Sequence, residues 1–268
     1  MKKPIITLLT DFGGRDHYVA AMKGVIVGIC PEARLVDITH EIPAYEITDA
    51  AYTLAQAAPC FPRGTVHLIV VDPGVGSARR PLLAEALGSR FVAPDNGVLT
   101  MILNADAKHR VREITSEKFF RAPVSRTFHG RDIFAPVAAH LASGIAPAQF
   151  GPRIEDHLRL NLSKPVRTAR RGWTGTILKI DRFGNIVTNF EWSSFGPMLA
   201  QDFVIHVGLR SVARLAENYG AIAPGELCAI EGSAGYVEIS AREASAAAIL
   251  GVAAGAPVEL RIGTSSAL

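Results

Sequence analysis

The sequence predicts an α/β protein, with an N-terminal layered, Rossmann-like α/β domain followed by a small C-terminal β-barrel domain. In the first half of the chain, short β-branched runs alternate with segments of helical periodicity, which is the pattern of a layered α/β domain. In the last third, the apolar runs are short, alternate in polarity and are bounded by glycines, which favours an antiparallel barrel or sandwich. We therefore expect an α/β domain over residues 1–158, a linker over 159–172 and a barrel over 173–268.

The elements of the first domain follow from periodicity. Val66–Val71 is the most continuous apolar run, and such runs suit strands buried on both faces of a parallel sheet. Asp16–Ile29 carries apolar residues at helical spacing. The other expected strands are 5–10, 35–39, 82–86, 91–93 and 111–114, and the other expected helices are 46–58, 97–103 and 132–143.

Six further strands are expected in the second domain, at 174–180, 186–190, 203–207, 227–231, 236–240 and 258–262. The segment between the domains is polar, contains a proline and has no period, which is typical of a linker. It includes the basic run Arg167–Arg171, which we interpret as solvated rather than as a phosphate contact.

Composition excludes several classes of protein. The 268 residues are 49% hydrophobic and 20% charged, with a net charge of only +3 from scattered basic residues. They can bury a sizeable core, and they lack the basic stripe expected of a nucleic-acid partner. Three cysteines without a C-x-x-C motif argue against a disulfide framework or a structural zinc site and fit a reducing cytoplasm. The N-terminal apolar stretch ends at Asp11, and the longest uncharged run, 244–258, is short; we expect a first strand rather than a signal peptide, and no membrane partner.

Loops that follow the expected strands are the first place to look for a site, because open α/β sheets bind ligands at the carboxyl ends of their strands. Asp11 follows the first strand and either binds a ribose diol or caps a turn, whereas Asp16 is expected to cap the next helix. Asp72 follows the most apolar strand, and Arg79 lies seven residues on. The loop can fold Arg79 back as a partner for Asp72, or it is a Pro-Gly turn with solvated arginines.

Two more loops complete the first domain. Asp95 and Asn96 follow a strand and favour turn and capping chemistry. His129 lies between Phe128 and Gly130 at an expected helix start, and it is the best catalytic candidate of the eight histidines. No dense metal-ligand spacing, dinucleotide fingerprint or P-loop occurs, so neither a metal nor a cofactor is expected.

In the second domain, Asp181 and Asn185 separate two expected strands. They are hairpin-turn residues, or they present a carboxylate and an amide to an amino-acid group. The glycine-rich segment 232–236 separates two more and either forms a tight turn or allows a flat ring to approach the backbone closely.

Seven segments together resemble one family. They are TDFGGRDHYVAAMKG (10–24), DITHEIP (37–43), VVDPGVGSAR (70–79), APDNGVLT (93–100), FHGRDIFAP (128–136), IDRFGN (180–185) and GSAGYVEIS (232–240). In this order, over nearly the whole chain, they resemble the S-adenosyl-L-methionine (SAM) hydroxide adenosyltransferases, or SAM hydrolases, which are relatives of the fluorinase and chlorinase enzymes.

The resemblance implies an α/β domain, a β-barrel and a homotrimer in which SAM lies between the N-domain of one subunit and the C-domain of its neighbour. It implies the reaction of SAM with water to give adenosine and L-methionine, with SAM as substrate and no cofactor. The implied catalytic residues are Asp72, Arg79 and His129. The implied substrate-binding residues are Asp11 for the ribose diol, Asp181 and Asn185 for the methionine end, Ser233 and Ala234 in the adenine and amino-acid contact loop, and Tyr45 and Phe128 as pocket walls.

Two departures refine this resemblance. The fluorinase branch has a long insertion after the DPGVG-like loop and lacks the Asp and the His, whereas this chain has no insertion and keeps both residues. Relatives commonly carry Asn-x-Gly near the position of Arg242, where this chain reads SAREASAAAILG (240–251). The alternatives are a SAM-dependent halogenase or a non-catalytic protein that binds adenosine or SAM.

Overall fold

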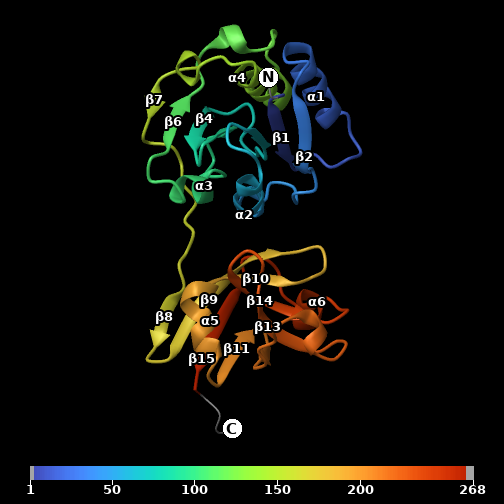
Figure 1. Ribbon diagram of the computed structural model, residues 1–268, viewed down its shortest axis with the longest axis vertical. Helices are drawn as coiled ribbons and strands as arrows, with labels where there is room; N and C mark the ends of the chain where they lie inside the picture. Colours follow the sequence, from blue (N-terminus) through green and yellow to red (C-terminus); the bar gives the residue numbers. More distant parts are fainter. Residues whose placement is uncertain (1–2, 264–268) are drawn as a thin grey trace. The chain divides into compact units, whose positions relative to one another are not determined.

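The computed structural model describes residues 3–263, which divide into two units between Leu160 and Asn161. The first unit is a layered α/β structure and the second is a barrel-like antiparallel sheet (Figure 1). The fold class expected from the sequence is therefore confirmed.

A seven-stranded mixed sheet with the order β2-β1-β3-β5-β4-β6-β7 forms the centre of the first unit. Its strands are β1 (Ile5–Thr10), β2 (Arg34–Thr39), β3 (Val66–Val70), β4 (Pro81–Ala86), β5 (Ser89–Pro94), β6 (Arg110–Glu113) and β7 (Arg153–Ile154). The pairs β2-β1, β1-β3 and β3-β5 are parallel, whereas β4, β6 and β7 join by antiparallel pairing. The carboxyl ends of β1, β3 and β5 therefore meet at one edge, where the loops with the candidate residues begin.

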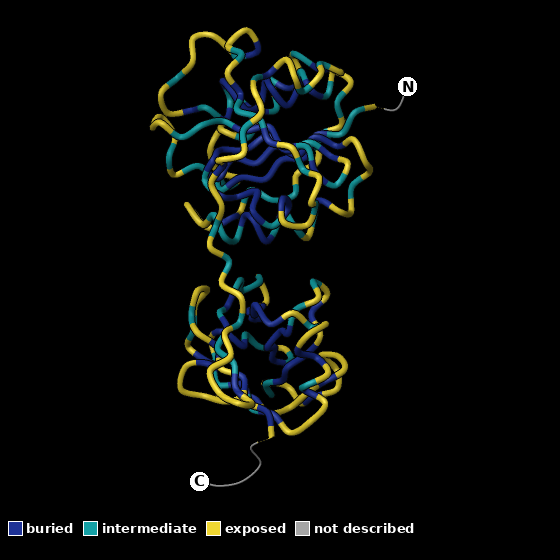
Figure 2. The backbone as a smooth tube through the Cα atoms, turned by 90° about the vertical axis from the view of Figure 1, so that its left-hand side faces the viewer, coloured by how far each residue is buried: buried dark blue, intermediate teal, exposed yellow. Residues whose placement is uncertain are grey.

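Helices cover both faces of this sheet. They are α1 (Tyr18–Ile29), α2 (Ile47–Ala57), α3 (Thr100–Asn104) and α4 (Ala135–Ala142), with short 3-10 segments η1 (Ala58–Cys60), η2 (Glu117–Phe119) and η4 (Pro147–Gln149) and a π-helical turn, η3 (Gly130–Phe134). Side chains alternate between the faces along each strand. Leu68 of β3 packs in a core with α1 and α4, and its neighbour Ile69 packs in a core with α2 and α3. The inner strands are accordingly buried along their length (Figure 2).

Two local expectations in this unit were wrong. Asp16 does not cap α1, because the N-cap residue is His17 and its side chain makes no capping hydrogen bond. The segment expected as a regular helix from residue 132 begins instead with the π-helical turn at Gly130. A wider turn of this kind changes the direction in which neighbouring side chains leave the backbone, and such turns are frequent at functional sites.

The second unit is an eight-stranded antiparallel sheet with the order β12-β11-β15-β9-β10-β14-β13, and β8 pairs with β9. The strands are β8 (Val166–Ala169), β9 (Gly172–Ile180), β10 (Ile186–Glu191), β11 (Phe203–Val207), β12 (Arg210–Val212), β13 (Leu227–Glu231), β14 (Tyr236–Ala241) and β15 (Pro257–Ile262). An isolated bridge joins Leu215, beyond β12, to Ala229 of β13, so the two ends of the sheet approach each other and the sheet nearly closes. The inward side chains form one core around Ile177, Phe190 and Leu260.

Three short helices and one strand in this unit have no counterpart in the expected elements. They are α5 (Trp192–Leu199), α6 (Ala246–Leu250), the 3-10 turn η5 (Tyr219–Ala221) and β12. In addition, β8 lies within residues 159–172, where a linker is expected. All four residues of β8 are exposed, so the strand shows no apolar alternation by which it could be recognised. No helix within residues 3–263 is long and apolar enough to cross a membrane.

Candidate active site

The loop after β3 folds Arg79 back onto Asp72. Turn hydrogen bonds from Val75 N to the Asp72 carbonyl (3.2 Å) and from Ser77 N to the Gly74 carbonyl (3.1 Å) reverse the chain. Gly76 adopts a left-handed φ of 77°, and a side chain there would clash with the carbonyl oxygen of Arg126. This position therefore requires glycine.

The guanidinium of Arg79 and the carboxylate of Asp72 form a buried ion pair. Arg79 Nε lies 2.9 Å from both Oδ1 and Oδ2, and Nη2 also donates to Oδ2. The side chains of Arg79 and Asp72 are only 8% and 5% exposed, and the guanidinium carbon lies 4.9 Å from the centroid of the Phe134 ring. Such a planar, charge-assisted contact fixes the orientation of both groups.

His129, which lies 50 residues after Arg79 in the sequence, contacts this ion pair. Arg79 Nη2 lies 3.0 Å from His129 Nδ1, and because a guanidinium can only donate, Nδ1 is the acceptor. Burial, followed by the charge of Arg79, lowers the pKa of His129 below its ordinary value. The imidazole is therefore neutral near pH 7, and the structure brings Asp72, Arg79 and His129 together as one hydrogen-bonded cluster.

The other candidates of the first unit surround the ends of the neighbouring strands. Asp11 Oδ2 accepts a hydrogen bond from Tyr45 N at 3.0 Å, so these two residues lie together, and the Tyr45 side chain is exposed. Phe128 is buried, with its ring 5.0 Å from Tyr18 and 6.1 Å from Phe12, centroid to centroid. It forms the apolar base from which His129 extends.

Asp95 and Asn96 carry out the turn chemistry expected of them. Asp95 is buried and accepts hydrogen bonds from Arg80 and from Leu158 N, at 2.9 and 2.7 Å. The Asn96 amide donates to the Val71 carbonyl at 2.8 Å, and Asn96 Oδ1 accepts from Val98 N at 3.2 Å. The loop after β5 is thus fastened to the end of β3, immediately before Asp72.

In the second unit, Asp181 and Asn185 lie together in the hairpin between β9 and β10. Asp181 Oδ1 accepts hydrogen bonds from Phe183 N (2.8 Å) and Asn185 N (2.9 Å), and Oδ2 accepts from Asn185 Nδ2 (2.9 Å). Gly184 has a φ of 85°, and its carbonyl accepts from Ala247 N at 2.9 Å. The hairpin is therefore rigid, and the carboxylate holds the amide of Asn185 in one orientation.

Ser233 and Ala234 form the tip of the turn between β13 and β14. Gly235 N donates to the Gly232 carbonyl at 2.9 Å, and Gly232 N donates to the Tyr236 carbonyl at 2.9 Å. Ser233 is exposed and Ala234 is half-buried. The backbone of this turn is thus accessible to a ligand, while its two ends are held by the hydrogen bonds between β13 and β14.

Comparison with known proteins decides the family. The family model described as SAM hydroxide adenosyltransferase N-terminal domain matches residues 6–151, and that of the C-terminal domain matches residues 175–259. The chain belongs to the SAM hydroxide adenosyltransferase family.

Similar proteins cover almost the whole chain. An (R)-S-adenosyl-L-methionine hydrolase of Salinispora tropica is 40% identical over 254 residues, covering 94% of this chain and 95% of the relative. A protein of the same name from Thermus thermophilus is 38% identical and covers 95% and 98%. A fluorinase of Nocardia brasiliensis is more distant, at 26% identity over 98% of both chains. Among solved structures, an uncharacterized conserved protein from Thermotoga maritima matches with a TM-score of 0.89 at 37% identity, covering 96% of this chain and 99% of that one.

Within this family's first domain, Asp132 supports the cluster and was missed by the sequence reasoning. It is fully buried and accepts hydrogen bonds from Ser125 N (2.9 Å) and Arg131 Nε (2.7 Å). Burial alone would raise the pKa of Asp132, but the hydrogen bonds from Arg131 and Ser125 lower it below its ordinary value. By holding the Ser125 backbone, Asp132 fixes the segment that precedes His129, and its negative charge acts on the pKa of the histidine. The signal in the sequence was an acid next to arginine, three residues after the histidine.

Glu238 was also missed. It lies on β14 and is 8% exposed, and its Oε1 accepts hydrogen bonds from Tyr219 Oη (2.7 Å) and Ser240 Oγ (2.9 Å). Burial, followed by the hydrogen bond to Glu238, raises the pKa of Tyr219 to about 12. Glu238 therefore ties the segment that carries Tyr219 to β14, the strand that follows the turn with Ser233 and Ala234. Near the departure in the sequence, Arg242 Nη1 donates to the Ile222 carbonyl at 3.0 Å.

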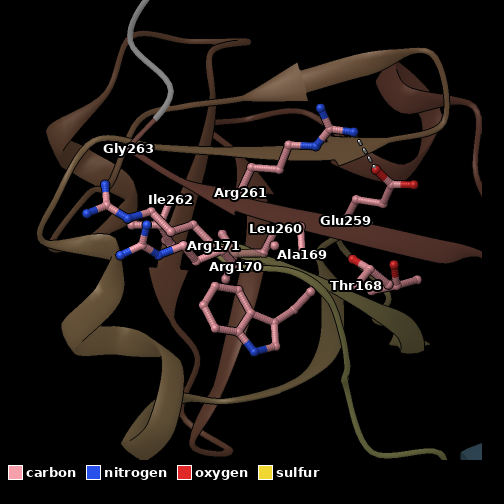
Figure 3. Close-up of a pocket in the computed structure, with 12 residues that line it drawn as sticks. Thr168, Ala169, Arg170, Arg171, Glu259, Leu260, Arg261, Ile262 and Gly263 are labelled. Atoms are coloured by element: carbon pink, nitrogen blue, oxygen red, sulfur yellow. Dashed lines mark hydrogen bonds and ion pairs between the residues drawn. The ribbon is translucent and has the colours of Figure 1, made fainter.

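A cavity of about 780 Å³ in the second unit contains none of the candidate site residues (Figure 3). It lies against β9 and β15 and is lined by Arg170, Arg171 and Trp173. Arg167 lies over the Trp173 ring, 5.7 Å from its centroid. The basic run expected to be a solvated linker is thus partly packed on an aromatic side chain.

Proposed function

We propose that the protein hydrolyses SAM to adenosine and L-methionine by attack of water at the ribose C5′. The observation that carries this proposal is the buried cluster of Asp72, Arg79 and His129 at the end of β3. Relatives at 36–40% identity named (R)-S-adenosyl-L-methionine hydrolase support it.

The reaction places its main demand on the nucleophile. Attack at C5′ breaks the bond to a sulfonium sulfur and releases a neutral thioether, so the leaving group needs no proton. Water is a weak nucleophile, and catalysis then depends on holding one water in line with the breaking bond and on removing its proton. Fixed charges in a buried site are well suited to this because they need no reorganisation during the reaction.

The hydrogen bonds of the cluster divide these tasks. His129 Nδ1 already accepts a hydrogen bond from Arg79, so the imidazole orients Arg79. The carboxylate of Asp72 has about four acceptor positions, of which Arg79 does not use all. Asp72 is therefore the group that accepts the proton of the attacking water, and Arg79 supplies the positive charge that stabilises hydroxide character.

The substrate-binding residues belong to both units. Among the described residues, Asp11 Oδ2 accepts a hydrogen bond from Tyr45 N, which leaves Oδ1 to accept from the ribose diol. In the proposed complex Tyr45 and Phe128 wall the pocket, Asp181 and Asn185 hold the methionine end, and Ser233 and Ala234 contact adenine. We propose a homotrimer in which the α/β unit of one subunit and the barrel of its neighbour share each site. SAM is the substrate, and no cofactor takes part.

A halogenase is the alternative reaction. The anionic carboxylate of Asp72 disfavours it, because a halide at the same position would be repelled.

The three cysteines of the chain are unpaired, which supports a cytoplasmic location.

The test is incubation of the purified protein with SAM, with and without excess chloride, followed by chromatography of the nucleosides. Adenosine and methionine in equimolar amounts, with no 5′-chloro nucleoside, are expected. A halogenated product, or the absence of turnover, would overturn the proposal. The variant Asp72→Asn serves as the control for contaminating hydrolases.

A further inference from the structure

A second polar cavity, of about 360 Å³, lies at the β6–β7 edge of the first sheet. Its polar lining consists of His109, Arg110, Arg153, Glu155, His157 and Arg159. It shares no residue with the cluster of Asp72 or with the other substrate-binding candidates. None of the residues that line this cavity takes part in the proposed hydrolysis.

The lining is strongly cationic. It carries three arginines against a single glutamate. Arg110 and Arg153 are exposed, and within the described residues their side chains form neither hydrogen bonds nor ion pairs. Arg159 makes one hydrogen bond, from Nη1 to Asn104 Oδ1, at 3.2 Å. Guanidinium groups with unused donors around one cavity favour an anion with several acceptor oxygens.

His157 gives an independent indication of a ligand. The residue is 9% exposed, yet among the described residues neither of its ring nitrogens has a hydrogen-bond partner. Buried polar groups in proteins are almost always paired, and a lone unpaired group calls for a bound water, ion or ligand. His157 is thus a buried polar side chain in the wall of a cationic cavity with both ring nitrogens unsatisfied.

His109 adds a second imidazole. Its Nδ1 lies 2.6 Å from the Asp106 carbonyl oxygen. Because a carbonyl can only accept, Nδ1 carries the hydrogen and Nε2 is unprotonated in the neutral ring. The His109 and His157 rings meet edge to face, with centroids 6.0 Å apart. Protonation of either ring would add a further donor on the same side of the cavity.

We propose that this cavity binds a phosphate group, either as the free ion or as the phosphate of a phosphomonoester such as a nucleotide. A phosphate dianion matches the excess of two positive charges from the arginines and the glutamate. It also offers more acceptor oxygens than a carboxylate. The volume of about 360 Å³ accommodates the phosphate together with several waters, or with part of the group to which the phosphate is esterified.

Binding should be linked to proton uptake by His157. Burial, followed by the charges of Arg159 and His109, lowers the pKa of this histidine. The charged groups that act on it are Arg159, His109 and Arg80, which lower its pKa, and Asp95, which raises it. A bound dianion opposes this lowering, so affinity increases as the pH falls through the histidine range.

The experiment is isothermal titration calorimetry of the full chain with inorganic phosphate, AMP and adenosine. The wild-type protein should bind one phosphate per chain, and Arg153→Gln should weaken this at least about tenfold, the loss of one charge-assisted contact. Arg210→Gln, an exposed arginine on β12 outside every described cavity, removes the same charge and should leave the affinity unchanged. Both substitutions are on exposed side chains, so the fold should persist.

Two comparisons separate the outcomes. AMP that binds more tightly than phosphate, with an advantage lost in Arg153→Gln, indicates a nucleotide, whereas equal affinities indicate the free ion. Sulfate, which stays a dianion, should bind about threefold more tightly at pH 6 than at pH 8 if the lowered pKa of His157 rises by about one unit on binding, and His157→Gln should abolish this difference. No binding of phosphate, or binding insensitive to Arg153→Gln, would overturn the proposal. Neither Arg153 nor His157 belongs to the cluster of Asp72, so SAM hydrolysis is measured separately on the same variants. A failure of the proposed hydrolysis can then be distinguished from a failure to bind phosphate.

Discussion

The substitution Asp72→Asn tests the cluster most sharply, because it preserves shape and removes charge. The Asp72 and Arg79 side chains are 5% and 8% exposed, so the variant leaves a guanidinium buried without its carboxylate. Removing one partner of a buried ion pair costs about 3–5 kcal/mol of unfolding free energy. The asparagine oxygen still accepts one hydrogen bond, so a loss of about 3 kcal/mol is expected.

The effect on turnover should be larger than the effect on binding. Without a carboxylate to accept the proton of water, kcat should fall by about 10²–10³-fold, the usual consequence of removing one preorganised electrostatic group. KM for SAM should change little, because the lost interaction acts in the transition state. The assay is steady-state kinetics with chromatography of adenosine, together with urea unfolding of the same preparations.

Asp95→Asn is the matched control. Asp95 is another buried acid, with 3% of its side chain exposed, and it pairs with Arg80, the residue next to Arg79. Arg80 keeps Asp156 as a second partner, so a smaller loss of stability, about 1–2 kcal/mol, is expected. Its kcat should stay near the wild-type value. A near-normal kcat in Asp72→Asn, or an equal fall in both variants, would refute the assignment of the carboxylate to the reacting water.

Three further predictions concern other parts of the molecule. Burial lowers the pKa of His67 on β3 to about 4. Because the folded-state pKa is depressed, the free energy of unfolding should fall by up to about 3 kcal/mol as the pH drops from 6.5 to 4. The urea midpoint of His67→Gln should lose this part of the pH dependence. Asp11→Ala and Asn185→Ala should raise KM for SAM more than they lower kcat, since both act in ground-state binding; an unchanged KM would contradict this. Mixing Asp72→Asn subunits with Asn185→Ala subunits after reversible dissociation, and assaying at a SAM concentration far below the raised KM of Asn185→Ala, should restore about a quarter of the sites if neighbouring subunits share them. An activity no higher than the average of the two parents, with exchange proven, would place each site within one chain.

Much of the fold could be predicted because burying one face of a strand or helix makes apolar residues recur at a regular period in the sequence. The strand expected at 203–207 is β11 as observed, and Leu68 and Ile69 of β3 face opposite cores. Elements without such a period were missed. The strand β8 is exposed throughout, and α5 contains Pro197 within eight residues, so neither shows the apolar spacing by which strands and helices are recognised.

The candidate site could be predicted only in part. Asp72 and Arg79 are close in sequence, and the loop's glycines allow them to meet. The bond between Arg79 and His129 joins residues 50 positions apart, and only the packing of α4 and the π-helical turn against the sheet places them together. Asp132 could not be distinguished from a surface acid, because its complete burial depends on the arginines and backbone groups that satisfy it.

Hydrolysis in water enriched in ¹⁸O tests the central claim most directly. If water held by Asp72, Arg79 and His129 attacks C5′, mass spectrometry should find one ¹⁸O atom in the 5′-hydroxyl of each adenosine formed and none in methionine. Adenosine without the label, or label in methionine, would contradict attack of water at C5′.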